Sequence, residues 1–125
     1  MDQQPQKSIL VVDDEAIIRD FLTEVLGDDY DITTAEDGDV AINCMQQGSF
    51  DLVITDLKMP RVPGEEVVKF ARQACPNAPV IIISGYSSLY TVSQSVSHGA
   101  SAFLAKPFSI KQLLDAVHGS LSPRG

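Results

Sequence analysis

The amino-acid sequence predicts an α/β fold, a doubly wound five-stranded parallel sheet with helices on both faces. Five short strand patterns alternate with amphipathic helical patterns, and the connections between them are short. Four of them, all but the one at 30–34, are apolar at consecutive positions, as in strands buried on both faces. Right-handed crossovers leave few topologies for five such units, which fit the strand order 2-1-3-4-5. We expect one domain at residues 8–121, between a flexible tail at 1–7 and a tail or cut linker at 122–125.

Composition narrows the class of protein. A chain of 125 residues with 44% hydrophobic and 21% charged residues is typical of one globular domain. The net charge of −8 argues against a nucleic-acid-binding surface, which needs basic clusters. No stretch has the length of a membrane span, and the N-terminus lacks a secretory signal. Cys44 and Cys75 imply no disulfide framework, so we expect a cytoplasmic protein in which both thiols serve in packing.

The first half of the chain supplies three strands and two helices. Strands are expected at 9–12, at 30–34 and at the run 52–54 that leads into Asp56. The second helix starts at Asp37-Gly38 and stops at Gly48. The first helix is closed by Gly27 and repeats its apolar residues along one face: Ile17, Ile18, Phe21, Leu22, Val25 and Leu26.

The second half continues the alternation. A helix is expected at about 64–74, where Glu65 and Glu66 complement the helix dipole, and strands are expected at 79–83 and 102–105. The serine-rich segment 88–98 has helical spacing but weak intrinsic helix propensity. The last helix opens on a capping-box pattern from Ser109 to Gln112. Its expected buried stripe is Ile110, Leu113, Leu114, Val117 and Leu121.

Parallel strands deliver reactive side chains to one edge of the sheet. Asp13 and Asp14 follow the first strand, Asp56 the third, Ser84 the fourth and Lys106 the fifth. Carboxylates this close repel one another, and a hard cation such as Mg²⁺ relieves that repulsion. An aspartate beside a cation and a lysine is equipped as a nucleophile toward a phosphoryl group. The spacing therefore predicts a phosphoryl-transfer site.

Four segments resemble the receiver domain of two-component response regulators. They are Val11-Val12-Asp13-Asp14-Glu15, Asp56-Leu57-Lys58-Met59-Pro60, Ser84-Gly85, and Phe103-Leu104-Ala105-Lys106-Pro107-Phe108. The resemblance covers nearly the whole chain and implies a flavodoxin-like (βα)5 three-layer sandwich similar to the chemotaxis regulators. It also implies that Asp56 accepts a phosphoryl group from a sensor kinase phosphohistidine.

The resemblance assigns roles to the residues at the strand ends. Asp14 and Asp56 would ligate Mg²⁺ (or Mn²⁺) directly with the backbone carbonyl of Lys58, and Asp13 would act largely through water. Ser84 would hydrogen-bond a phosphoryl oxygen, and Lys106 would pair with the phosphate. Phe103 would be the aromatic residue that swings inward after phosphorylation. The peptide bond Lys106-Pro107 is expected to be cis.

Partners and output are also implied by the resemblance. A sensor histidine kinase or phosphotransfer protein would supply the phosphoryl group. The chain would then change a binding face around the fourth helix, the fifth strand and the last helix, for a downstream protein or a fused output domain. A phosphorylation-linked homodimer through that face fits the same pattern. No direct contact with nucleic acid or membrane and no turnover of a separate substrate are expected.

Two other functions fit the fold but not the motifs. A flavin-binding domain would need a hydroxyl- or glycine-rich phosphate loop after the first strand, where Asp13-Asp14-Glu15 would repel a phosphate. A Mg²⁺-dependent aspartyl phosphatase would need Asp-x-Asp there.

His98 and His118 lie at helix ends, where solvated or capping roles are ordinary. The weak helix at 88–98 is the expected moving element, because switching elements come from low-stability regions.

Overall fold

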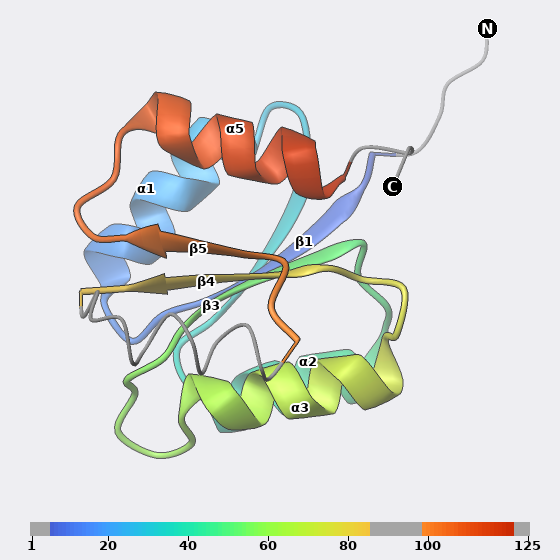
Figure 1. Ribbon diagram of the computed structural model, residues 1–125. Helices are drawn as coiled ribbons and strands as arrows, with labels where there is room; N and C mark the ends of the chain where they lie inside the picture. The colour runs from blue at the N-terminus through green and yellow to red at the C-terminus, as the bar shows by residue number, and fades with distance from the viewer. Residues whose placement is uncertain (1–5, 86–98, 122–125) are drawn as a thin grey trace, which may run out of the picture.

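The computed structural model describes residues 6–85 and 99–121, and it contains the five expected strands (Figure 1). All neighbouring strands are parallel, and their order is β2-β1-β3-β4-β5, which confirms the predicted topology. The elements are β1 (Ser8–Val12), α1 (Ala16–Leu26), β2 (Asp31–Ala35), α2 (Gly38–Gln47), β3 (Leu52–Asp56), α3 (Gly64–Ala74), β4 (Val80–Ser84), β5 (Ala102–Ala105) and α5 (Ile110–Ser120). The helix expected at 88–98 lies outside the described residues.

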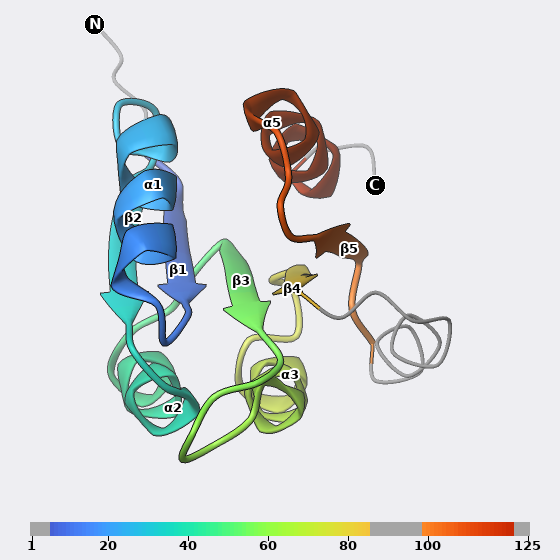
Figure 2. The same cartoon turned by 90° about the vertical axis from the view of Figure 1, so that its left-hand side faces the viewer.

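Two helical layers enclose the sheet. Figure 2 shows α1 and α5 on one face and α2 and α3 on the other. Successive strand residues point to opposite faces, so each apolar run supplies both cores. Ile9 and Val11 of β1 pack with Leu22 of α1, whereas Leu10 and Val12 belong to the core under α2 and α3. This explains why the strands are apolar at consecutive positions.

Burial follows the strand order. Every residue of the inner strands β3 and β4 is buried. The edge strands β2 and β5 are only partly covered. Asp56 and Ser84 are the last residues of β3 and β4. Their polar side chains therefore lie at the end of a buried apolar core. The fold places them at the carboxyl edge of the sheet, where open α/β sheets bind ligands.

Two predicted core positions are wrong. Ile17 is 74% exposed and Ile110 is 49% exposed, although both continue the apolar stripe of their helices. Each lies in the first turn of a helix that begins past the carboxyl end of a strand, where little sheet surface remains to cover it. Further along the helices, Leu22, Leu113 and Val117 are fully buried, whereas Leu114 and Leu121 are partly buried against the same core.

Other local predictions are confirmed. Ser109 and Gln112 form the reciprocal hydrogen bonds of a capping box at the start of α5. Both cysteines are free thiols, with Cys75 buried and Cys44 half-buried against the α2–α3 core. His118 is exposed in the last turn of α5, and His98 lies outside the described residues. Within residues 6–85 and 99–121, no helix has the length and apolar character that crossing a bilayer requires.

Candidate functional site

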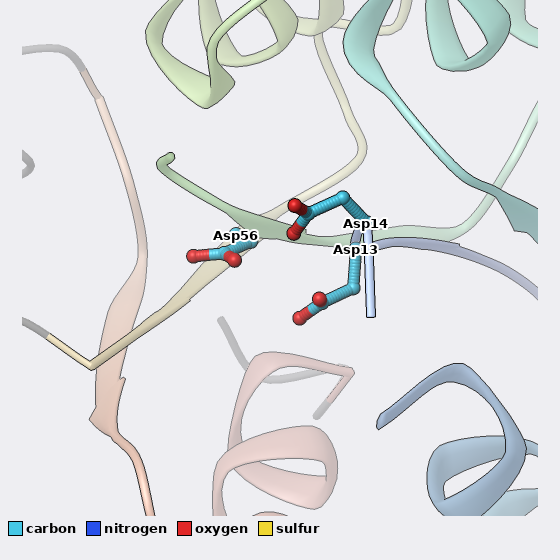
Figure 3. Close-up of side chains that lie close together, drawn as sticks. All are labelled: Asp13, Asp14 and Asp56. Atoms are coloured by element: carbon cyan, nitrogen blue, oxygen red, sulfur yellow. The ribbon is translucent and has the colours of Figure 1, made fainter. Parts of the chain in front are cut away.

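The polar residues predicted from the strand ends come together at one cleft. Its volume is about 490 Å³, and it lies at the carboxyl edge of the sheet. Figure 3 shows the carboxylates of Asp13, Asp14 and Asp56 gathered there, the first two just after β1 and the third at the end of β3. The residues that line the cleft are Asp14, Glu15, Asp56, Lys58, Ser84, Gly85 and Lys106.

Asp13 is the fully buried member of the acidic cluster. Its Oδ1 accepts a hydrogen bond of 2.9 Å from the backbone N–H of Glu15, which forms a tight turn after β1. Arg19 of α1 donates to the Asp13 carbonyl at 2.7 Å, so the turn is held from the helix as well. Burial raises the pKa of the Asp13 carboxyl, although the Glu15 N–H and the Lys106 ammonium oppose this shift.

Asp56 is oriented by contacts with the chain that follows it and with Lys106. Its Oδ1 accepts a hydrogen bond of 2.7 Å from the backbone N–H of Leu57, and its Oδ2 accepts one of 3.2 Å from Lys106 Nζ. The side chain is almost completely covered yet borders the cleft. Burial raises the pKa of the Asp56 carboxyl, and the nearby Lys106 charge partly offsets this rise. Asp56 is thus a fixed carboxylate with one open side.

Lys106, just after β5, contacts three of the acidic residues at this edge. Its backbone N–H donates to the Ser84 carbonyl at 2.8 Å, which anchors the end of β5 on β4. Its Nζ lies 2.9 Å from Glu15 Oε1, 3.0 Å from Asp13 Oδ2 and 3.2 Å from Asp56 Oδ2. Burial alone would lower the pKa of the ammonium, but the hydrogen bonds to Glu15 and Asp13 and the nearby carboxylates raise it. Lys106 therefore remains a cation at neutral pH.

Ser84, Phe103 and Lys58 also lie where the sequence predicts. Ser84 is buried and borders the cleft, next to Ala105 in the β4–β5 register. Phe103 pairs with Ile82 and is half-buried against the α2–α3 core. Lys58 is exposed and lines the cleft just past β3. The bond between Lys106 and Pro107 is cis, as expected.

Two residues at this edge have contacts that the sequence reasoning missed. Glu15 forms the shortest of the three Lys106 contacts. The sequence places Glu15 in a motif but gives it no role of its own. Asp37 was interpreted as the start of α2, which is correct, but its buried carboxylate also binds the loop after β3. The only sequence signal for Asp37 was local, the Asp-Gly pair before a helix.

The acidic residues fit a divalent cation. One carboxylate oxygen from each of Asp13, Asp14 and Asp56 lies within 4.8 Å of the others. Asp13 Oδ2 is buried, and the Lys106 ammonium lies 3.0 Å from it. Oxygen ligands of this kind, in a cleft with room for waters, match the preference of Mg²⁺.

Comparisons with known proteins agree on one family. Residues 9–118 match the response regulator receiver domain. PilR, a response regulator protein of Pseudomonas aeruginosa, is 34% identical over 95% of this chain and 27% of its own length. The chain spans between 9% and 57% of the length of the curated relatives it matches.

Solved structures show the same fold. The chemotaxis protein CheY4 of Vibrio cholerae is 31% identical, with a TM-score of 0.88 over 94% of this chain and 100% of that chain. The response regulator TrrA of Thermotoga maritima is 38% identical, with a TM-score of 0.83 over 93% of this chain and all of its own. The TrrA structure is a complex with Mg²⁺ and beryllium fluoride.

Proposed function

Because this chain belongs to the response regulator receiver domain family of two-component systems, we propose that Asp56 accepts a phosphoryl group from a phosphohistidine. The observation that carries the proposal is the pair of contacts on Asp56. Leu57 N–H fixes one carboxylate oxygen, and Lys106 Nζ stands at the other, beside an open cleft. A positioned nucleophile next to a fixed positive charge is most of what phosphoryl transfer requires.

The transfer is a single displacement at phosphorus. A bond forms between a carboxylate oxygen of Asp56 and the phosphorus atom, and the bond from phosphorus to the imidazole nitrogen breaks. The electron pair of that bond leaves on the imidazole of the donor. Lys106 pairs with the phosphoryl oxygens, which places its ammonium where negative charge is carried. Ser84, at the end of β4, hydrogen-bonds a phosphoryl oxygen with its hydroxyl.

Mg²⁺, or Mn²⁺ in its place, supplies further charge neutralisation when bound. Asp14 and Asp56 would be its direct carboxylate ligands, with the backbone carbonyl of Lys58, and Asp13 would act largely through water. The support is the 4.8 Å grouping of the three carboxylates, of which Asp13 is fully buried. The solved TrrA complex contains Mg²⁺ with beryllium fluoride, on a chain 38% identical to this one.

The phosphoryl donor is a sensor kinase or a phosphotransfer protein. An apolar groove of about 410 Å³ lies next to the cleft, and Lys106 lines both. The other groove residues are Ile18, Phe21, Pro107 and Phe108. Because the donor histidine must reach Asp56, a protein bound over the cleft would also cover this groove. The exposed Ile17 lies beside groove residue Ile18 in the sequence and provides an apolar contact for the same partner.

Output follows from a rearrangement around the phosphorylated site. Ser84 moves toward the phosphoryl group, and Phe103 turns further into the space beside β4, changing the face formed by β5 and α5. Phe103 lacks a hydroxyl, so packing alone decides between its two positions. The downstream partner is a separate protein or a fused output domain. The larger size of the relatives favours the fused domain. The domain therefore acts as a signalling switch.

Intact mass tests the proposal. Incubation with acetyl phosphate and Mg²⁺ is expected to add one base-labile phosphate to the wild-type chain and none to Asp56→Asn. Asp51→Asn is the matched control, because Asp51 precedes β3 at its opposite end, where its carboxylate accepts from Ser8 N–H. That variant is expected to gain the phosphate. A wild-type mass unchanged by every donor, or a phosphate that persists in Asp56→Asn, would contradict the proposed role.

A further inference from the structure

We infer that Asp37 is a positioning residue that holds the β3–α3 loop, and with it the Lys58 carbonyl, against the cation site. The inference rests on the proposed function, because it assumes that this carbonyl is a ligand. Asp37 itself is the residue before α2 and follows the edge strand β2. It therefore lies outside the set of residues delivered by the ends of β1, β3, β4 and β5.

The carboxylate of Asp37 binds two segments far apart in sequence. Its Oδ1 accepts hydrogen bonds from the backbone N–H groups of Gly38 at 2.8 Å and Val62 at 2.7 Å. Its Oδ2 accepts from the backbone N–H of Arg61 at 3.2 Å. The residue is only 1% exposed, so water does not compete for these contacts. A carboxylate that accepts backbone N–H groups in such a site makes strong, charge-assisted hydrogen bonds.

These contacts fix the far end of the loop that begins at Asp56. At the near end, Leu57 N–H donates to Asp56 Oδ1, and the Leu57 carbonyl accepts from Gly64 N–H at 2.9 Å. Between Leu57 and the Arg61 N–H held by Asp37 lie only residues 58–60. Pro60 fixes its own φ and restricts the residue before it. The Lys58 carbonyl therefore has little freedom while both ends are held.

Close packing reinforces the same arrangement. A Cβ added to Gly38 would overlap the backbone of Val62 and lie 2.8 Å from its Cβ. A Cβ added to Gly64 would overlap the carbonyl oxygen of Asp56 and lie 2.8 Å from Leu57 Cα. Helices α2 and α3 thus approach the loop more closely than any side chain would permit. At these two points the loop has no space to move toward α2 or α3.

A nearby surface ion pair provides a contrast. The Arg61 guanidinium contacts both oxygens of Asp39, at 3.0 and 3.1 Å, across the same gap between α2 and the loop. Both side chains are about half exposed, so solvent and salt weaken the pair. We expect this pair to contribute little to loop position. Asp39→Asn therefore makes a suitable control two residues from Asp37.

Removal of the Asp37 carboxylate is expected to weaken cation binding more than the transfer step. In Asp37→Ser the short hydroxyl can still cap α2 but cannot reach Val62 and Arg61 together. Asp37→Asn keeps the shape but replaces one acceptor oxygen with a donor. In both, the Lys58 carbonyl becomes mobile, and the cation must order it on binding. Loss of such a supporting contact typically costs about 10-fold in metal affinity or more.

The test is a titration of the full chain with Mg²⁺, in which NMR chemical shifts report binding. Amide hydrogen exchange is measured separately, in the metal-free protein. Asp37→Ser and Asp37→Asn are expected to raise the Mg²⁺ Kd about 10-fold. Their phosphorylation rate by acetyl phosphate at saturating Mg²⁺ is expected to stay within about twofold of wild type. The N–H groups of Arg61 and Val62 are expected to exchange faster in the metal-free variants.

Two controls separate positioning from general destabilisation. Ser109→Ala removes the cap of α5, which lies on the face of the sheet opposite to α2 and α3 (Figure 2), and Asp39→Asn removes the surface pair. Both are expected to keep the wild-type Mg²⁺ Kd within about twofold, even where Ser109→Ala lowers the melting temperature as much as Asp37→Ser does.

Each failure has its own signature. An unchanged Mg²⁺ Kd in either folded Asp37 variant overturns the inference and leaves the proposed function intact. An equal rise of Kd in Ser109→Ala also overturns it, since the effect would then follow stability. A wild-type chain that shows no Mg²⁺-dependent shifts overturns the cation site of the proposed function, and this inference with it.

Discussion

The two helical faces of the sheet have similar cores but differ at the carboxyl edge. Under each pair of helices lies a cluster of buried apolar residues from the sheet and the helices. At the edge, the α2–α3 face is closed, because Asp37 and Gly38 lie directly against the β3–α3 loop. The α1–α5 face is open there, with an apolar groove and two exposed isoleucines, Ile17 and Ile110. One face thus fixes the site, and the other leaves it accessible.

The open groove is not a defect of packing. Phe21 of α1 and Phe108, which precedes α5, face one another with ring centroids 6.1 Å apart at an angle of 53°. Both rings belong to the groove lining and pack on the core beneath it. An apolar hollow between α1 and residues 106–108, next to the acidic cleft, is the arrangement expected of a surface that binds a partner.

The largest expected effect compares two positions of α5. Leu113 is fully buried, and Leu113→Ala should lower the free energy of unfolding by about 2–5 kcal/mol, through lost burial and a cavity. Ile110 is 49% exposed, and Ile110→Ala should cost less than about 1 kcal/mol. Urea denaturation of both variants measures the difference. Equal losses would mean that Ile110 belongs to the core after all.

The next prediction concerns the closed face. Gly38→Ala places a methyl group against Val62 and should destabilise the fold by about 1–3 kcal/mol. Alanine normally improves a helix over glycine, by up to about 1 kcal/mol. Gly119→Ala is the matched control, because Gly119 lies in α5 and its added Cβ would meet nothing within 4 Å. It should be neutral or stabilising, and thermal denaturation should show opposite signs for the two variants.

If Gly38→Ala also stabilised the protein, the contact between α2 and the β3–α3 loop would be looser than the structure indicates. Asp37 would then have no fixed loop to hold. The sign of this one substitution therefore decides whether the closed face is rigid.

Much of this contrast could not be predicted from sequence. The strands and the residues at their ends were predictable, because each apolar run stops at a polar residue and parallel topology gathers those ends. Residues 64–74 were predicted as a helix and form α3. Strand β4 is shifted by one residue from its predicted range, to Val80–Ser84. The proline at 79 has no N–H for the ladder, whereas the Ser84 carbonyl accepts from Lys106.

The missed features depend on distance in space rather than on local pattern. Helical periodicity places Ile17 on the apolar face of its helix, but it does not show where the sheet beneath that face ends. The Asp37-Gly38 pair indicates a helix start, yet the bond from Val62 spans 25 residues. Glu15 lies next to two metal-site candidates, and its contact with Lys106 spans 91 residues. Such contacts follow from tertiary packing, which a single sequence does not specify residue by residue.

The role of the open α1–α5 face in partner binding is tested by comparing a protein phosphoryl donor with a small-molecule donor. Ile17→Asp puts a charge at an apolar position that is 74% exposed, so the fold should tolerate it. Transfer from a phosphorylated histidine domain that serves the wild-type chain should slow about 10-fold, which corresponds to about 1.4 kcal/mol of lost partner contact. Phosphorylation by acetyl phosphate should not change, because this small donor needs only the cleft.

Glu24→Gln supplies the control for that experiment. Glu24 is exposed on the same helix α1, two turns further from the carboxyl edge of the sheet. It should leave transfer from both donors unchanged. If Ile17→Asp slowed both donors equally, the substitution would be acting on Asp56 rather than on a partner surface. If it slowed neither, the donor protein would bind without the apolar groove, and the open face would need another role.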